Sequence, residues 1–116
     1  MSILNPLVRE EILERREYQL KIAEKAAKRN TLVVLPTALG KTIIAALTAS
    51  HFLYNFSHLK VLVMAPTRPL VLQHREVFMK ILKIRPSDVQ VLTGKYTPSY
   101  RLHAWSGSYR IFFATP

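Results

Sequence analysis

From Thr31 to the end of the chain, short runs of β-branched and aliphatic residues alternate with longer stretches of helical periodicity. The short runs lie at 31–35, 60–65, 89–92 and 110–114. Most of them are nearly continuous in apolar residues, which is typical of parallel strands covered on both faces. The alternation predicts the α/β class, with a parallel sheet sandwiched by helices.

Helical periodicity fills the intervals between the apolar runs and also precedes the first of them. The expected helices are, in chain order, 16–29, 41–54, 69–82 and 98–105. The last two open with a proline at or near the first helical turn, where proline is favoured. In such a fold, ligands bind beyond the carboxyl ends of the strands. A length of 116 residues indicates one domain.

The chain is strongly basic and contains no cysteine. Its 17 Lys and Arg residues against 7 Asp and Glu residues give a net charge of +10, which favours polyanionic partners. The lack of cysteine excludes a disulfide framework, a thiolate nucleophile and Cys-ligated zinc. No apolar run approaches the about 18 residues of a membrane span, and no targeting signal is evident, so we expect a soluble cytoplasmic protein without a membrane partner.

The tripeptide GKT at 40–42 follows the first apolar run and opens a helical pattern. Strand, loop, GKT and helix is the context of a phosphate-binding loop, in which backbone N–H groups and the helix dipole meet phosphate. Gly40 would allow close backbone approach, Lys41 would contact the β- and γ-phosphates, and Thr42 would ligate Mg²⁺. The alternative is a tight turn at Gly40 beside a solvated lysine.

The loop departs from the general pattern GxxxxGK[ST], because Leu35 stands at its first glycine. A second departure appears against the helicase motif PTGLGKT, which the loop PTALGKT at 36–42 resembles, with Ala38 in place of the usual glycine. If that position needs a positive φ, the alanine Cβ carries a cost and Ala38→Gly should tighten nucleotide binding.

Other segments resemble the remaining motifs of the superfamily 2 helicases. They are, in chain order, REYQ at 16–19, APTRPLV at 65–71, LTG at 92–94 and ATP at 114–116. The wording PLVLQH at 69–74 is similar to the archaeal Hef group, whose relatives include the FANCM and Mph translocases that act on branched DNA. The resemblance implies that residues 1–116 form part of the first RecA-like motor lobe of an ATP-dependent DNA helicase.

The resemblance also implies which residues hold ATP and Mg²⁺. Gln19 would hydrogen-bond the adenine edge and Arg16 would flank the base. The loop residues that would surround the phosphates are Thr37, Ala38, Leu39, Gly40, Lys41 and Thr42. Lys41 and Thr42 are the candidate catalytic residues, and Thr42 is the candidate Mg²⁺ ligand.

A second group of residues would contact single-stranded or branched DNA. Its expected members are Thr67, Arg68, Thr93, Gly94 and Thr115. Hydroxyl, guanidinium and main-chain donors of this kind contact sugar and phosphate, so they position a strand without reading its sequence. The four histidines show no metal-ligand spacing and are expected to be surface or capping groups.

Hydrolysis in this superfamily needs an acidic box, in which Asp holds Mg²⁺ and Glu orients water. Asp88 is the only aspartate in the chain and is followed by Val89. We therefore expect that the chain alone does not hydrolyse ATP, that it ends before a DEAH-type box, and that the uncovered sheet favours self-association.

Two other functions remain open at this point. A small kinase or another non-helicase phosphate-loop enzyme would also carry the GKT loop, but would not need APTRPLV or LTG. A basic nucleic-acid-binding module with a vestigial loop would bind DNA without binding nucleotide. Nucleotide titration separates the last alternative from the others.

Overall fold

A computed structural model of the chain describes residues 3–13, 17–36, 38–93 and 107–116. Its helices are α1 (Glu17–Lys28), α2 (Ala38–Asn55) and α3 (Arg68–Ile81), with a short 3₁₀ helix η1 (Pro86–Asp88). Its strands are β1 (Val61–Met64), β2 (Val89–Leu92) and β3 (Ile111–Ala114). These elements lie close to the predicted ranges, whereas the helix expected at 98–105 lies outside the described residues.

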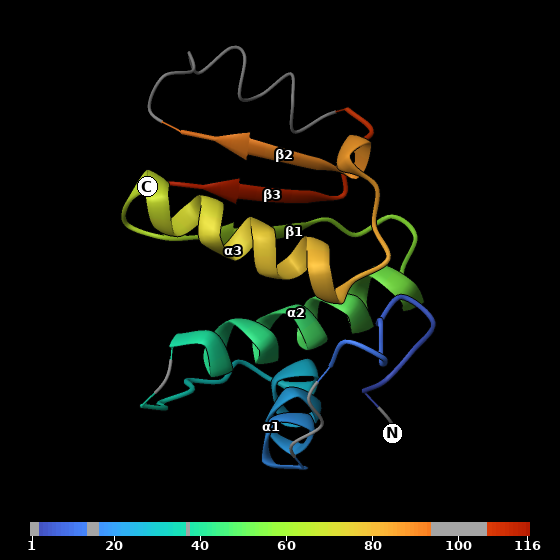
Figure 1. The fold of residues 1–116 in the computed structure, drawn as a ribbon. Helices are drawn as coiled ribbons and strands as arrows, with labels where there is room; N and C mark the ends of the chain where they lie inside the picture. The colour runs from blue at the N-terminus through green and yellow to red at the C-terminus, as the bar shows by residue number, and fades with distance from the viewer. Residues whose placement is uncertain (1–2, 14–16, 37, 94–106) are drawn as a thin grey trace.

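The three strands form one parallel sheet in the order β1-β3-β2 (Figure 1). In register, Met64 lies beside Ala114, and Ala114 lies beside Leu92. The central strand β3 is buried along its whole length, in agreement with its continuous apolar sequence. The prediction of a parallel α/β fold is confirmed.

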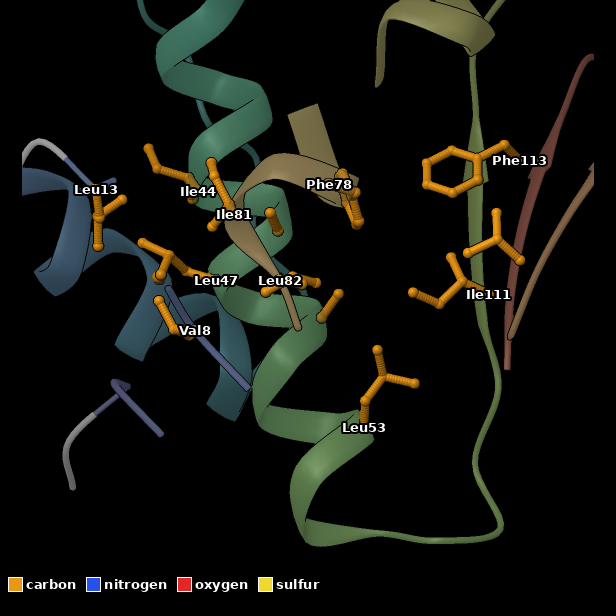
Figure 2. Packing of buried hydrophobic residues seen from close by; sticks show 14 of the residues in the cluster. Val8, Leu13, Ile44, Leu47, Leu53, Phe78, Ile81, Leu82, Ile111 and Phe113 are labelled. Carbon is orange, nitrogen blue, oxygen red and sulfur yellow. The ribbon is translucent and has the colours of Figure 1, made fainter. Parts of the chain in front are cut away.

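Helices α2 and α3 cover one face of the sheet, and α1 packs against α2 (Figure 1). The core between α3 and the sheet includes an edge-to-face contact of Phe78 with Phe113, whose ring centroids lie 5.1 Å apart (Figure 2). Because successive side chains of β3 point to opposite faces of the sheet, Phe112 and Ala114 lie in a second, smaller cluster on the other face. Within the described ranges both helices that cover the sheet lie on one face. Of the two helical layers expected, the layer on that face is therefore the one that is seen.

The prediction of a strand at 31–35 is wrong for this structure. The segment has no strand partner in the described part of the chain, and Leu32 and Val34 are 88% and 79% exposed. A cavity of about 500 Å³ lies between Thr31 and Val33 on one side and the residues of β1 on the other. Apolar pattern alone cannot make a strand, because a strand needs a neighbour for its N–H and C=O groups.

The N-terminal segment 3–13 contributes to the core, which its sequence did not predict. Ile3, Val8 and Leu13 are buried there, and Val8 forms an isolated antiparallel bridge with Leu82. The segment thus packs against the C-terminal end of α3.

Candidate functional site

The carboxyl ends of the three strands meet at one edge of the sheet. There the N–H of Ala65 donates to the carbonyl of Ala114 at 3.1 Å, and the N–H of Thr115 donates to the carbonyl of Leu92 at 3.1 Å. These bonds extend the ladder by one residue beyond each strand. Thr93 and Thr115, which come from distant parts of the sequence, are therefore brought to the same edge.

Helix α3 begins at this edge directly after β1. Thr67 is its N-cap, with an extended backbone, and its side-chain oxygen accepts a hydrogen bond from the N–H of Leu70 at 3.4 Å. Serine and threonine favour this position because they satisfy a free N–H of the first turn. Arg68 is the first residue of the helix, and both Thr67 and Arg68 are exposed.

Helix α2 also begins on this side of the molecule, near the arrowheads of the strands (Figure 1). Its first turn holds no acidic residue. Lys41 is exposed and Thr42 is 7% exposed. A helix N-terminus with a lysine and no carboxylate has the electrostatic character that favours an anion.

The helix begins three residues earlier than the sequence predicts, at Ala38 rather than Lys41. Ala38 and Gly40 therefore belong to its first turn. No positive φ occurs among the described residues, so the hypothesis that Ala38 must adopt one is not supported. Alanine is the residue with the highest helix propensity, so it suits this position.

A cavity of about 290 Å³ adjoins this turn of α2. It is lined by Lys41, Thr42, Ala45, Val63, Met64, His74 and Phe78. Among these residues, only Lys41, Thr42 and His74 carry polar side chains. The ammonium and hydroxyl groups fit the phosphates of a nucleotide with Mg²⁺, a cation that takes few protein ligands besides phosphate and water.

His74 is the residue of this cavity that sequence reasoning missed. Its Nδ1 lies 3.2 Å from the side-chain oxygen of Thr42, within hydrogen-bond distance. The histidine had been expected to be a surface or capping group. A signal was available, because position 74 lies on the helix face that buries Val71 and Phe78, where an apolar residue is the norm.

Arg16 and Gln19 are the residues expected at the adenine site, and the structure describes Gln19. It lies in the first turn of α1 and is 5% exposed. Its amide has no hydrogen-bond partner within the described part of the chain, although a buried amide ordinarily has one. Arg16, Thr37 and Gly94 lie outside the described residues, as do the side chains of Ala38 and Leu39.

The described residues contain no group of three or more His, Cys, Asp or Glu side chains that could hold a metal ion. They also contain no helix that is both long and apolar enough to cross a membrane.

A parallel sheet whose carboxyl edge adjoins the N-terminus of a GKT-bearing helix defines the class of RecA-like phosphate-loop folds. The model of the DEAD/DEAH box helicase family matches residues 16–116. The chain belongs to this family.

Named relatives agree with the family match. The chain is 46% identical over 101 residues to the DEAD-box ATP-dependent DNA helicase Fancm of Drosophila melanogaster, covering 87% of this chain and 7% of that protein. It is 42% identical over 102 residues to the ATP-dependent DNA helicase MPH1 of Coccidioides immitis, covering 88% of this chain and 9% of that protein. The chain therefore spans less than a tenth of the length of these relatives.

A solved structure shows the same fold. The helicase domain of Hef from Pyrococcus furiosus superposes with a TM-score of 0.83 at 41% sequence identity, over 95% of this chain and 23% of that one. The predicted resemblance to the FANCM, Mph and Hef group is confirmed.

Proposed function

We propose that the chain is the nucleotide-binding and nucleic-acid-contacting part of an ATP-dependent DNA helicase or translocase. One observation carries the proposal. The N-terminus of α2, the Thr67 and Arg68 segment, and the threonines that follow β2 and β3 all lie at the carboxyl edge of the sheet. This edge is where open parallel sheets bind their ligands.

On the nucleotide side, Lys41 would contact the β- and γ-phosphates, and the N-terminal N–H groups of α2 would add the positive end of the helix dipole. Thr42 would supply a hydroxyl ligand to Mg²⁺, which neutralises phosphate charge when bound. Gln19 would donate to and accept from the adenine edge. Its burial without a partner in the described ranges supports that role.

On the nucleic-acid side, Thr93 lies at the same edge but is buried. Arg68 would supply an exposed guanidinium, and Thr67 and Thr115 would supply side-chain hydroxyls nearby. Their contacts would be to sugar and phosphate, so binding should depend on salt more than on sequence. Among the described residues, no ion pair joins Arg68 or Lys41 to an acidic group. Both cations are therefore available to external phosphates.

Two binding measurements on the 116-residue chain test the proposal. Calorimetric titration with Mg·ADP should show binding, and fluorescence anisotropy with a labelled single strand should show an affinity that falls steeply with salt. Arg68→Ala should weaken DNA binding about threefold to tenfold, as expected for a lost phosphate contact, and should lower the salt slope by about 1. Arg29→Ala removes an exposed arginine at the far end of α1 and is the matched control.

The same two measurements separate the alternatives. Nucleotide binding without DNA binding would favour a non-helicase phosphate-loop enzyme, and DNA binding without nucleotide binding would favour a basic module with a vestigial loop. Equal DNA affinity in the Arg68→Ala and Arg29→Ala variants would reject the assigned surface. The chain should release no phosphate from ATP above background, because its sequence lacks a DEAH-type acidic pair.

Three finer features belong to the proposal. Branched or forked DNA is the proposed substrate of the whole protein, on the resemblance of 69–74 to the Hef group. ATP and DNA as substrates would place it inside the cell. Self-association would use the face of β1 that points away from α2 and α3, where Leu62 and Met64 are 48% and 52% exposed. Light scattering at rising concentration would detect it.

A further inference from the structure

The contact between Thr42 and His74 joins two helices that serve different ligands in the proposed function. Thr42 lies in the first turns of α2, beside Lys41, whereas His74 lies in α3, which begins at Arg68. Their side chains meet at 3.2 Å, between the side-chain oxygen of Thr42 and Nδ1 of His74. The bond spans 32 positions in the sequence, so it is tertiary and not an incidental local contact.

This pair lies at least partly shielded from solvent. Thr42 is 7% exposed and His74 is half-buried. Among the described residues that line the cavity around them, all the others except Lys41 carry apolar side chains. In such surroundings a hydrogen bond is electrostatically stronger than in water, and its loss leaves a polar group that solvent reaches poorly.

A threonine hydroxyl that ligates Mg²⁺ gives the metal an oxygen lone pair. Its hydrogen must then point away from the metal, toward an acceptor. The neutral imidazole has one acceptor nitrogen, and in this structure Nδ1 of His74 lies within reach of the hydroxyl. His74 therefore has the position and chemistry to orient the hydroxyl with its lone pair toward the phosphate side.

We propose that His74 is a positioning residue for Mg·nucleotide, acting through the hydroxyl of Thr42. This inference rests on the proposed function and adds to it a residue outside the phosphate loop. It assigns to His74 the Nε2–H tautomer, with Nδ1 as the acceptor. It also gives α3 a direct polar link to the nucleotide site.

The first test measures nucleotide affinity of the 116-residue chain with and without the metal. His74→Ala should weaken Mg·ADP binding about fivefold to tenfold, the range expected for one net hydrogen bond. In EDTA its ADP affinity should stay within about twofold of the parent, because the hydroxyl then has no metal to ligate. His74→Asn places an acceptor oxygen at the position of Nδ1 and should restore most of the Mg·ADP affinity.

Gln73→Ala is the matched control, because Gln73 is the exposed neighbour of His74 on the same helix. It should change neither affinity. Equal losses for His74→Ala with Mg²⁺ and in EDTA would show a merely structural role and reject the inference. Unchanged Mg·ADP affinity in that variant would also reject it, while leaving the proposed function intact. Absence of ADP binding by the parent would reject both.

A second measurement needs no nucleotide and reads the parent chain directly. Long-range ¹H–¹⁵N spectra of the parent chain report the tautomer of each histidine, and His74→Asn assigns the signal by its disappearance. The Nε2–H tautomer at neutral pH is the expected result. The Nδ1–H tautomer would overturn the assignment, because Nδ1 would then donate to Thr42 and compete with the metal for its lone pair.

Discussion

The two edges of the sheet are both basic, but they use their cations in opposite ways. At the amino edge, the guanidinium of Arg110 donates to the carbonyls of Leu59, Leu53 and Phe56 at 3.0–3.2 Å. These carbonyls lie at the end of α2 and in the turn that follows it, where helical partners run out. The guanidinium of Arg110 is thus hydrogen-bonded within the molecule.

Lys60 behaves in the same way at this edge. Its ammonium donates to the carbonyl of Gly107 at 2.9 Å and also to that of Tyr109, and it lies 5.6 Å from the ring centroid of Phe112. At the carboxyl edge, by contrast, Lys41 and Arg68 are exposed, and no ion pair engages them in the described part of the chain. The comparison shows that net charge alone does not locate a binding surface, since only unsatisfied cations can bind an external anion.

The largest expected effect is on folding and comes from the amino edge. Arg110→Ala removes a charged donor from three carbonyls, of which that of Phe56 still accepts from the N–H of Leu59. The variant should lower the free energy of unfolding by about 3 kcal/mol, since hydrogen bonds to charged groups are the stronger ones. Urea denaturation measures the change, with Arg29→Ala as the exposed control. A loss below about 1 kcal/mol would mean that water replaces the guanidinium at little cost.

At the carboxyl edge, the corresponding change should affect binding and leave folding intact. Lys41→Ala removes an exposed ammonium and should weaken Mg·ADP binding about 30-fold to 100-fold, which corresponds to about 2–3 kcal/mol. The free energy of unfolding should not change. Lys80→Ala, an exposed lysine on α3, is the matched control for calorimetry and denaturation. A fall in stability with unchanged ADP affinity would contradict the comparison.

A smaller effect is expected at Ala38. Because this residue belongs to the first turn of α2 and no described residue has a positive φ, glycine relieves no strain there. Ala38→Gly should cost up to about 1 kcal/mol in helix propensity and should leave Mg·ADP affinity equal or slightly weaker. Calorimetry on the parent chain and on Ala38→Gly decides between this expectation and the hypothesis that position 38 needs a positive φ. Tenfold tighter binding would restore the positive-φ hypothesis.

The smallest effect concerns Asp88 at the amino edge. Its partial burial alone would raise its pKa, but hydrogen bonds from the side chain and backbone of Arg85, with the charges of Arg85 and Arg110, lower the pKa below its ordinary value. A carboxylate with a lowered pKa stabilises the fold above its unfolded pKa of about 3.9, and this contribution disappears as the pH falls through the folded value.

Asp88→Asn should therefore reduce stability slightly at neutral pH and should converge with the parent in acid. The loss is small because Arg85 is exposed and its ion pair is screened by solvent. Denaturation across pH 7 to 2 provides the measurement. A difference between parent and variant that widens as the pH falls would show that the pKa is raised instead.

Local pattern was sufficient for most of the elements and for the position of the site. The ranges of α1, α3, β2 and β3 followed from apolar periodicity and, for α3, from Pro69 near its start, because such signals are local to each element. The rule that parallel strands bind ligands at their carboxyl ends then placed Thr93 and Thr115 at one edge. Motif order alone predicted the family, which the family match confirmed.

Three features were decided by tertiary structure, because each depends on a partner far away in the sequence. Residues 31–35 have a strand-like composition but no neighbouring strand among the described residues. Leu32 and Val34 are therefore exposed, although Val33 and Leu35 pack partly against the core. Arg110 is satisfied by carbonyls more than fifty positions earlier, which no local pattern indicates. His74 meets Thr42 only because α2 and α3 pack on the same face of the sheet. Sequence periodicity determines which face a side chain occupies, but the packing of the helices determines which group it meets there.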